Sequence, residues 1–180
     1  MLCVSACAAF VFIYSQIQLD ASNIIEFKPK LTTQIYDRNG ELIANVFEEN
    51  RLYASYNEIP PRIIESLIAI EDTSFFEHGG VNPEAITRAI VKDVKAMKMV
   101  EGASTLTQQL IKNMALTREK KLTRKLKEVV LAIKLENELN KEQILERYLN
   151  HVYFGHGYHG IKTAAKGYFH KNLDELSLKE

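Results

Sequence analysis

The sequence predicts a mainly α-helical domain with a small N-terminal β-hairpin region, preceded by a membrane-anchor helix. Three observations predict this: apolar side chains recur at helical spacing from residue 62 onward, two alternating segments flank Asn39-Gly40, and residues 1–19 carry no charge. The chain has 180 residues, of which 46% are hydrophobic and 26% charged. This is enough material for one domain with a hydrophobic core, and it excludes a wholly disordered chain.

The N-terminal segment differs in composition from the rest of the chain. Residues 1–14 (MLCVSACAAFVFIY) are almost entirely apolar, which is at the short end of the roughly 20 residues that a bilayer-spanning helix needs. We expect residues 1–19 to form a transmembrane or signal-anchor segment; a cleaved signal peptide and a buried helix are the alternatives. Cys3 and Cys7 lie one helical turn apart in this apolar run and indicate no disulfide framework, metal site or catalytic thiol.

Residues 20–58 are expected to hold a linker, up to Leu31, and a hairpin over residues 32–47. Pro60-Pro61 then ends the extended region and starts a helix over residues 62–71.

Capping signals place the helices that follow. Asn82 and Pro83 start a helix that reaches about residue 99, and Ser104 caps one that ends near residue 115. A long helix is predicted over residues 118–139, and Asn140 with Gln143 forms a capping box for a helix ending near residue 152.

The segment EDTSFFEHGG, residues 71–80, is the first candidate for chemistry. Glu71 falls inside the apolar arc of the helix that precedes it, and Asp72 lies at the edge of that arc. Burial, the neighbouring charge and the negative end of the helix would each raise the pKa of Glu71, which suits a general base or acid near neutral pH. An ordinary ion pair or a backbone cap is the alternative for Glu71. His78 by itself indicates only a loop histidine.

The segment GASTLTQQLIKN, residues 102–113, is the second candidate. A glycine before a helix start leaves backbone N–H groups free, and Ser104 adds a hydroxyl, so that together they suit a phosphate. Gln108, Gln109 and Lys112 follow on the first turns of the helix. A capped helix with a polar face is the alternative interpretation.

The basic segment REKKLTRKLKEVVLAIK, residues 118–134, is the third candidate. Leu126 belongs to its predicted apolar stripe, whereas Arg124 and Glu128 lie together on the opposite face. Such a face is usually only solvated, but cations such as Arg124 and Lys125 beside one carboxylate would bind phosphates if a cleft opened there. No nucleic acid is expected as a partner, because 23 Lys and Arg residues are balanced by 23 Asp and Glu residues and no aromatic side chains are interleaved.

Together, in this order, these segments resemble the peptidoglycan glycosyltransferase (transglycosylase) domain of class A penicillin-binding proteins and monofunctional transglycosylases, glycosyltransferase family 51. The resemblance runs from about residue 59 to residue 169. It rests on EDTSFFEHGG, GASTLTQQLIKN, RKLKE (124–128), KEQILERYLN (141–150) and FGHGYHGIKTAAKGYF (154–169), with YDRNGELIA in the hairpin.

The resemblance implies a lysozyme-like helical domain over residues 59–180, with its C-terminal part truncated. It implies a bacterial enzyme held by a single pass in the cytoplasmic (inner) membrane, with its catalytic domain on the periplasmic, outer side. The reaction would polymerise lipid II into glycan strands with release of undecaprenyl pyrophosphate. Expected partners are lipid II, the growing glycan chain, membrane lipid and other cell-wall synthesis proteins. A following transpeptidase domain, as in a bifunctional penicillin-binding protein, is left open.

The resemblance also implies roles for individual residues. Glu71 would be the general base for the 4-hydroxyl of the acceptor sugar, and Glu128 would assist departure of the pyrophosphate, either directly or through a divalent ion such as Mg²⁺ or Mn²⁺. No cofactor is expected to be obligatory and no metal ligand is assigned. The motif around Glu146 and Asn150 would be chiefly structural. The positions that match the family's phosphate and sugar sites are Arg88, Ser104, Gln108, Gln109, Lys112, Arg124 and Lys125.

Two other function classes stay open on the sequence alone. A lysozyme-like glycosidase or lytic transglycosylase also centres on one glutamate of raised pKa, but it releases no diphosphate that cations would neutralise. A non-catalytic, membrane-anchored cell-wall scaffold would keep the fold without turnover. The sequence also departs from the family at Tyr158 and His159, where the family commonly has a small residue and then tyrosine.

Overall fold

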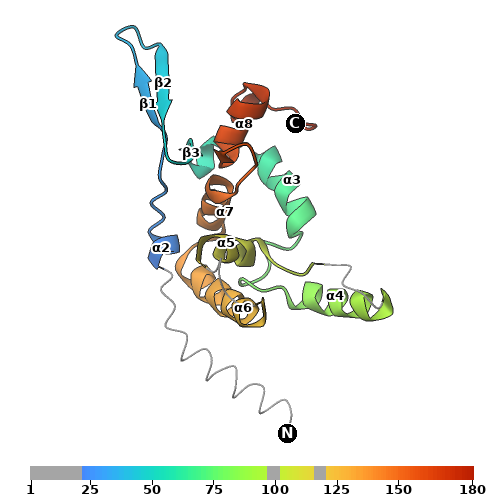
Figure 1. Cartoon of the computed structure of the whole chain (residues 1–180). Helices are drawn as coiled ribbons and strands as arrows, with labels where there is room; N and C mark the ends of the chain where they lie inside the picture. The colour runs from blue at the N-terminus through green and yellow to red at the C-terminus, as the bar shows by residue number, and fades with distance from the viewer. Residues whose placement is uncertain (1–21, 97–101, 116–120) are drawn as a thin grey trace.

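The computed structural model describes residues 22–96, 102–115 and 121–180, and its architecture is mainly helical, as the sequence predicts (Figure 1). The centre of the fold is α5 (Leu106–Ala115), which packs against α6 (Lys121–Glu138) and α7 (Lys141–His151). Burial of large aliphatic side chains between these helices stabilises the domain, at roughly 1.5–3 kcal/mol for each fully buried side chain. The core side chains on the three helices include Leu106, Leu110, Ile111, Leu131, Leu135, Ile144 and Leu145.

Two helices flank this centre, and both begin where the sequence predicts. The helix α3 (Pro61–Glu71) starts with proline at its first position, where the missing N–H costs no hydrogen bond. The helix α4 (Pro83–Ala96) is capped by Asn82, whose side-chain oxygen accepts from the N–H of Ala85 at 2.9 Å. The predicted end of this second helix, near residue 99, lies outside the described residues.

The buried face of α6 differs from the predicted one. Leu126, expected in the apolar stripe, is 45% exposed, whereas Glu128, expected on the polar face, is only 3% exposed. Glu128 shares one face with Leu131 and Leu135, because they follow it at spacings of three and then four residues. Because apolar residues occur on both sides of this helix, either face could have been the buried one. Packing against α5 buries the face that contains Glu128. The predicted start of the helix, residues 118–120, lies outside the described residues.

The predicted hairpin is present as β1 (Thr33–Tyr36) and β2 (Leu42–Val46), which pair antiparallel. Gly40 in its loop has a φ of +85°, which explains why glycine is needed there. The hairpin projects away from the helices, and most of its side chains are exposed (Figure 1).

The expected linker is wrong in part, because residues 22–25 form the short helix α2 (Ser22–Ile25). Ile24 is buried in the core, and Arg147 on α7 donates hydrogen bonds to the carbonyls of Ile24 and Ile25, at 2.8 and 2.6 Å. The burial of Ile24 and the hydrogen bonds from Arg147 therefore attach this segment to the domain.

The expected membrane anchor, residues 1–19, lies outside the described residues. Among the residues that are described, no helix is both long enough and apolar enough to cross a membrane.

The C-terminal part of the domain closes onto the segment that follows the hairpin. The strand β3 (Asn50–Arg51) pairs in parallel with β4 (Tyr158–His159), which leads into α8 (Ile161–Phe169). Between them Gly160 has a φ of +82°, and a Cβ there would lie 2.9 Å from the carbonyl oxygen of Asn150. A side chain at this position would therefore clash with α7. Two 3₁₀ turns complete the described elements, η1 (Tyr56–Glu58) and η2 (Leu173–Glu175).

Asn150 and Glu146 on α7 hold this junction. The Asn150 amide accepts from the N–H of Ala54 at 2.8 Å and donates to its carbonyl at 2.7 Å. A Glu146 carboxylate oxygen accepts from the N–H of Tyr56 at 2.6 Å, and the other accepts from the hydroxyl of Tyr53. Each contact satisfies backbone or phenol groups of residues 53–56, which agrees with the structural role expected of this motif.

Candidate active site

A pocket of about 200 Å³ lies where the end of α3, the start of α4 and the segment before α5 meet. Three predicted site residues line it from these three elements: Glu71, Arg88 and Ser104. Asp72 and Asn82 contribute to the same wall. The pocket therefore combines carboxylates with a guanidinium and a hydroxyl.

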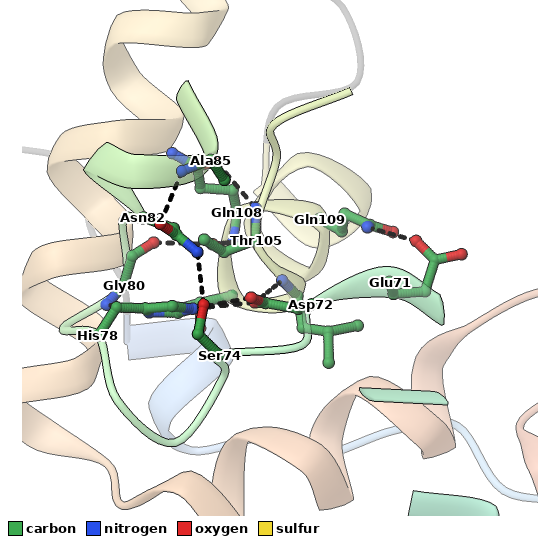
Figure 2. Close-up of polar contacts among 12 residues, drawn as sticks. Glu71, Asp72, Ser74, His78, Gly80, Asn82, Ala85, Thr105, Gln108 and Gln109 are labelled. Atoms are coloured by element: carbon green, nitrogen blue, oxygen red, sulfur yellow. Dashed lines mark hydrogen bonds and ion pairs between the residues drawn. The ribbon is translucent and has the colours of Figure 1, made fainter. Parts of the chain in front are cut away.

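Glu71 is exposed, so the predicted burial of this side chain is wrong. The last turn of α3 extends beyond the core, and Ile70 beside Glu71 is 80% exposed. Nε2 of Gln109 donates to Oε2 of this carboxylate at 2.9 Å, and Figure 2 shows the two side chains pointing toward each other. This hydrogen bond holds the exposed acid at the rim of the pocket.

The buried acid is Asp72, which the sequence placed only at the edge of the apolar arc. One of its oxygens accepts from the N–H of Leu106 at 3.0 Å, and both lie 3.0 Å from Nε2 of His78 (Figure 2). The N–H of Gly80 donates to Nδ1 of His78, so Nε2 carries the proton that faces Asp72. Sequence reasoning missed this pair. Its signal was the spacing of an acid and a histidine six residues apart in one short loop.

The N-cap of α5 is Thr105, not Ser104 as predicted. The Thr105 hydroxyl accepts from the N–H of Gln108 at 3.2 Å, and the Gln108 side chain accepts from the N–H of Thr105 at 3.1 Å, which is a capping box. The Thr105 hydroxyl also donates to the carbonyl of Gly80 at 2.7 Å. With Thr105 as the cap, the hydroxyl of Ser104 is available to the neighbouring helix.

Two predicted cations of α6 pair with the buried Glu128, and one of them also contacts Gln108 on α5 and Ser104 in the segment before α5. The two oxygens of Glu128 pair with Nε of Arg124 at 3.1 Å and Nζ of Lys125 at 3.2 Å. The same Lys125 ammonium donates to Oγ of Ser104 at 2.7 Å and lies 3.5 Å from Oε1 of Gln108. Glu128 anchors both cations, and Lys125 also contacts Ser104, which lines the pocket.

The start of α5 connects the two predicted acids. Gln108 lies beside Lys125, which pairs with Glu128, and the next residue, Gln109, donates to Glu71. Lys112 is exposed one turn further along, and the structure does not place it among the residues that line the pocket.

A second set of buried contacts supports the loop between α3 and α4. Nζ of Lys141 donates to the carbonyl of His78 at 2.6 Å and lies 4.4 Å from the centre of the Phe75 ring. Lys141 also pairs with Glu136, which accepts from the hydroxyl of Thr107 at 2.6 Å. Sequence analysis did not single out Lys141 or Glu136, because each appeared only as an ordinary charge on a helix.

A divalent ion does not fit the surroundings of Glu128. Both carboxylate oxygens are already paired with Arg124 and Lys125, so an ion there would meet one carboxylate and two cations. Within the described ranges, no group of three or more His, Cys, Asp or Glu side chains is arranged to hold a metal.

Comparison with known proteins adds an independent observation. Residues 39–180 match the family described as Transglycosylase. The chain is 46% identical over 149 residues to penicillin-binding protein 1F of Bacillus subtilis, which covers 83% of this chain and 21% of that protein. It is 42% identical over 161 residues to penicillin-binding protein 1A of Aquifex aeolicus, covering 89% of this chain and 22% of that protein. Penicillin-binding protein 1A of Escherichia coli is also 42% identical over 161 residues, covering 89% of this chain and 19% of that protein. The chain thus spans about a fifth of the length of these relatives.

Proposed function

The chain belongs to the transglycosylase family, and we propose that it is a peptidoglycan glycosyltransferase that polymerises lipid II into glycan strands. The observation that carries this proposal is the pocket in which Glu71 lies with Arg88 and Ser104, next to the cations that Glu128 anchors. Such a site offers a base for a sugar hydroxyl and positive charge for a diphosphate, which are the two requirements of this transfer.

The transfer proceeds in one step with inversion at the donor sugar. The 4-hydroxyl oxygen of the acceptor forms a bond to the anomeric carbon of the donor, and its proton passes to the Glu71 carboxylate. The bond from that carbon to the diphosphate oxygen breaks, and its electron pair leaves with undecaprenyl pyrophosphate. Because Glu71 is exposed at the rim of the pocket, an acceptor sugar has access to it.

The negative charge that develops on the leaving diphosphate is met by cations. Arg88 lies in the pocket, and Lys125 reaches its rim through Ser104. Glu128 is buried between Arg124 and Lys125, so its role in this proposal is to hold the two cations in place. No step uses a divalent ion.

We further propose that the domain works on the periplasmic side of a bacterial cytoplasmic membrane, with residues 1–19 as its single anchor. Lipid II and the growing glycan chain are its substrates in this proposal, membrane lipid surrounds the anchor, and other cell-wall synthesis proteins are its partners. The apolar composition of residues 1–14 and the lipid tail of the substrate support this placement.

The test is the conversion of labelled lipid II to glycan polymer by the full chain in detergent, compared with the Glu71→Gln variant. The amide cannot accept the hydroxyl proton, so the rate is expected to fall about 100-fold or more. Circular dichroism should show an unchanged fold, because the Glu71 side chain is exposed. Glu77→Gln, an exposed acid in the same loop, serves as the control and should keep the wild-type rate.

The alternatives have their own outcomes in this assay. A wild-type chain that cuts purified glycan strands without elongating lipid II would be a glycosidase. A folded wild-type chain with neither activity would be a scaffold, and a wild-type rate in Glu71→Gln would remove Glu71 from the mechanism.

A further inference from the structure

Tyr148 on α7 is linked to Glu71 through two consecutive hydrogen bonds. Its side chain is only 7% exposed, and its hydroxyl lies 3.1 Å from Oε1 of Gln109. On the other side of the same amide, Nε2 of Gln109 lies 2.9 Å from Oε2 of Glu71. Among the described residues, Gln109 is the residue of α5 that donates to Glu71, the proposed base. Tyr148 on α7 in turn holds the Gln109 amide through its buried phenol.

The direction of these hydrogen bonds follows from the chemistry of the three groups. An ionised carboxylate only accepts hydrogen bonds, so the amide must turn its N–H group toward Glu71. The amide oxygen then faces Tyr148, which must donate. Burial, and secondarily the charge of Glu71, raise the pKa of Tyr148 to about 12, which keeps the donating proton on the phenol.

Without the phenolic hydroxyl, nothing on α7 would select one orientation of the Gln109 amide. Rotation by 180° exchanges its oxygen and nitrogen and brings a second acceptor against the Glu71 carboxylate, where it stabilises neither the charge nor the position of that group.

We propose that Tyr148 is a positioning residue for the transfer: it fixes the Gln109 amide so that Glu71 stays oriented and ionised for the acceptor hydroxyl. This inference rests on the proposed function. It gives the hydroxyl of this buried tyrosine a function. The other charged groups that line the pocket with Glu71 are Asp72 and Arg88.

The test variant is Tyr148→Phe, which keeps the ring and removes only the hydroxyl. Loss of one hydrogen bond that supports a charged group is expected to lower kcat about 10-fold with the KM for lipid II unchanged. The acidic limb of the pH–rate profile should move upward, because the Gln109 amide is no longer held by Tyr148 with its N–H group toward the carboxylate.

The matched control is Tyr53→Phe. Tyr53 also donates from a partly buried hydroxyl to a glutamate, Glu146, but at the junction behind the site. This variant should lower the unfolding temperature and leave the pH–rate profile unchanged. If Tyr148→Phe behaves in the same way, its hydroxyl has a structural role only and the inference is overturned.

A double-mutant cycle with Gln109→Ala tests the route of the effect. Because Tyr148 acts through Gln109, removing its hydroxyl in the Gln109→Ala background should change kcat less than twofold. A full 10-fold loss in that background would contradict the proposed path.

Titration of the Glu71 carboxylate by ¹³C NMR, assigned with Glu71→Gln, gives a readout that needs no activity. The midpoint should move upward in Tyr148→Phe, and an unchanged midpoint overturns the inference even if the enzyme is active. A wild-type chain that does not polymerise lipid II would instead defeat the proposed function, whatever the titration shows.

Discussion

Lys125 and Ser104 join α6 to the segment before α5, with the lysine ammonium 2.7 Å from the serine hydroxyl. The same ammonium lies 3.2 Å from the buried Glu128, so its charge is fixed at the rim of the pocket. The proposed diphosphate site therefore consists of an anchored cation rather than a mobile surface lysine.

Lys125→Ala is expected to weaken binding of the pyrophosphate-bearing donor by about tenfold, since a charge-assisted hydrogen bond to the diphosphate is lost. Arg124→Ala and Lys112→Ala should act in the same direction. Donor affinity can be measured by competition with labelled lipid II in detergent. Lys166→Ala, at an exposed lysine on α8, is the control. If all three variants bind the donor as tightly as this control does, the result contradicts a phosphate site.

Gly80→Ala is expected to destabilise the fold strongly. Gly80 has a φ of +90°, and a Cβ there would lie 2.6 Å from the backbone carbonyl of Ala132 on α6. Gly40 has a similar φ of +85° but open space around it, so Gly40→Ala measures backbone strain alone. Backbone strain should lower the free energy of unfolding by about 1–2 kcal/mol in both variants. In Gly80→Ala the clash with Ala132 should lower it by about 1–3 kcal/mol more. Chemical denaturation measures the difference, and equal losses would show that α6 moves aside freely.

Asn150→Ala is expected to lower the free energy of unfolding by about 2–4 kcal/mol, because it leaves the buried N–H and carbonyl of Ala54 without their side-chain partner. Asn57→Ala, at an exposed asparagine in the nearby 3₁₀ turn, should change it by less than about 0.5 kcal/mol. The urea midpoint with an unchanged slope is the measurement. Similar midpoints for the two variants would mean that water replaces the Asn150 amide at no cost.

His151 is expected to make stability depend on pH just below neutrality. Burial, and then the nearby Arg51, lower the pKa of His151 from 6.5; Glu49, His159 and the carbonyl of Asn113 also act on it. As the pH falls, His151 takes up its proton at a higher pH in the unfolded chain than in the folded one. The contribution of His151 to the free energy of unfolding is therefore complete above about pH 6.5 and is lost as the pH falls below that value.

The unfolding temperature should therefore fall as the pH drops below about 6.5, and His151→Gln should flatten that slope. His170→Asn, at an exposed histidine, is the control and should leave it unchanged. Glu58 does not interfere, since Lys162 and Ser55 lower its pKa to about 2 and its contribution is lost only below pH 4.5. An identical slope in His151→Gln would contradict the assignment.

Local signals in the sequence were sufficient for much of the fold. Prolines and cap residues fixed the starts of α3, α4 and α7, and Asn39-Gly40 fixed the hairpin, because each depends on residues a few positions apart. The family resemblance, and no local signal, grouped Ser104, Gln108 and Lys125 with Glu128; in the structure Lys125 contacts the other three, while their functional roles stay predictions.

What the sequence could not predict depends on contacts between distant segments. The burial of Asp72 instead of Glu71 is decided by the N–H of Leu106, which lies 34 residues away. The capping role of Thr105 involves the carbonyl of Gly80, 25 residues earlier. The roles of individual site residues in catalysis remain predictions, because they concern a substrate that the fold alone does not identify.

The junction at Asn150 has a consequence for biosynthesis. The chain emerges from the ribosome with residues 50–54 early, yet their backbone partners are Asn150, Thr163 and the strand Tyr158–His159. A nascent chain that ends before Thr163 therefore leaves residues 50–54 without these partners, and the domain can close only after Thr163 has been synthesised.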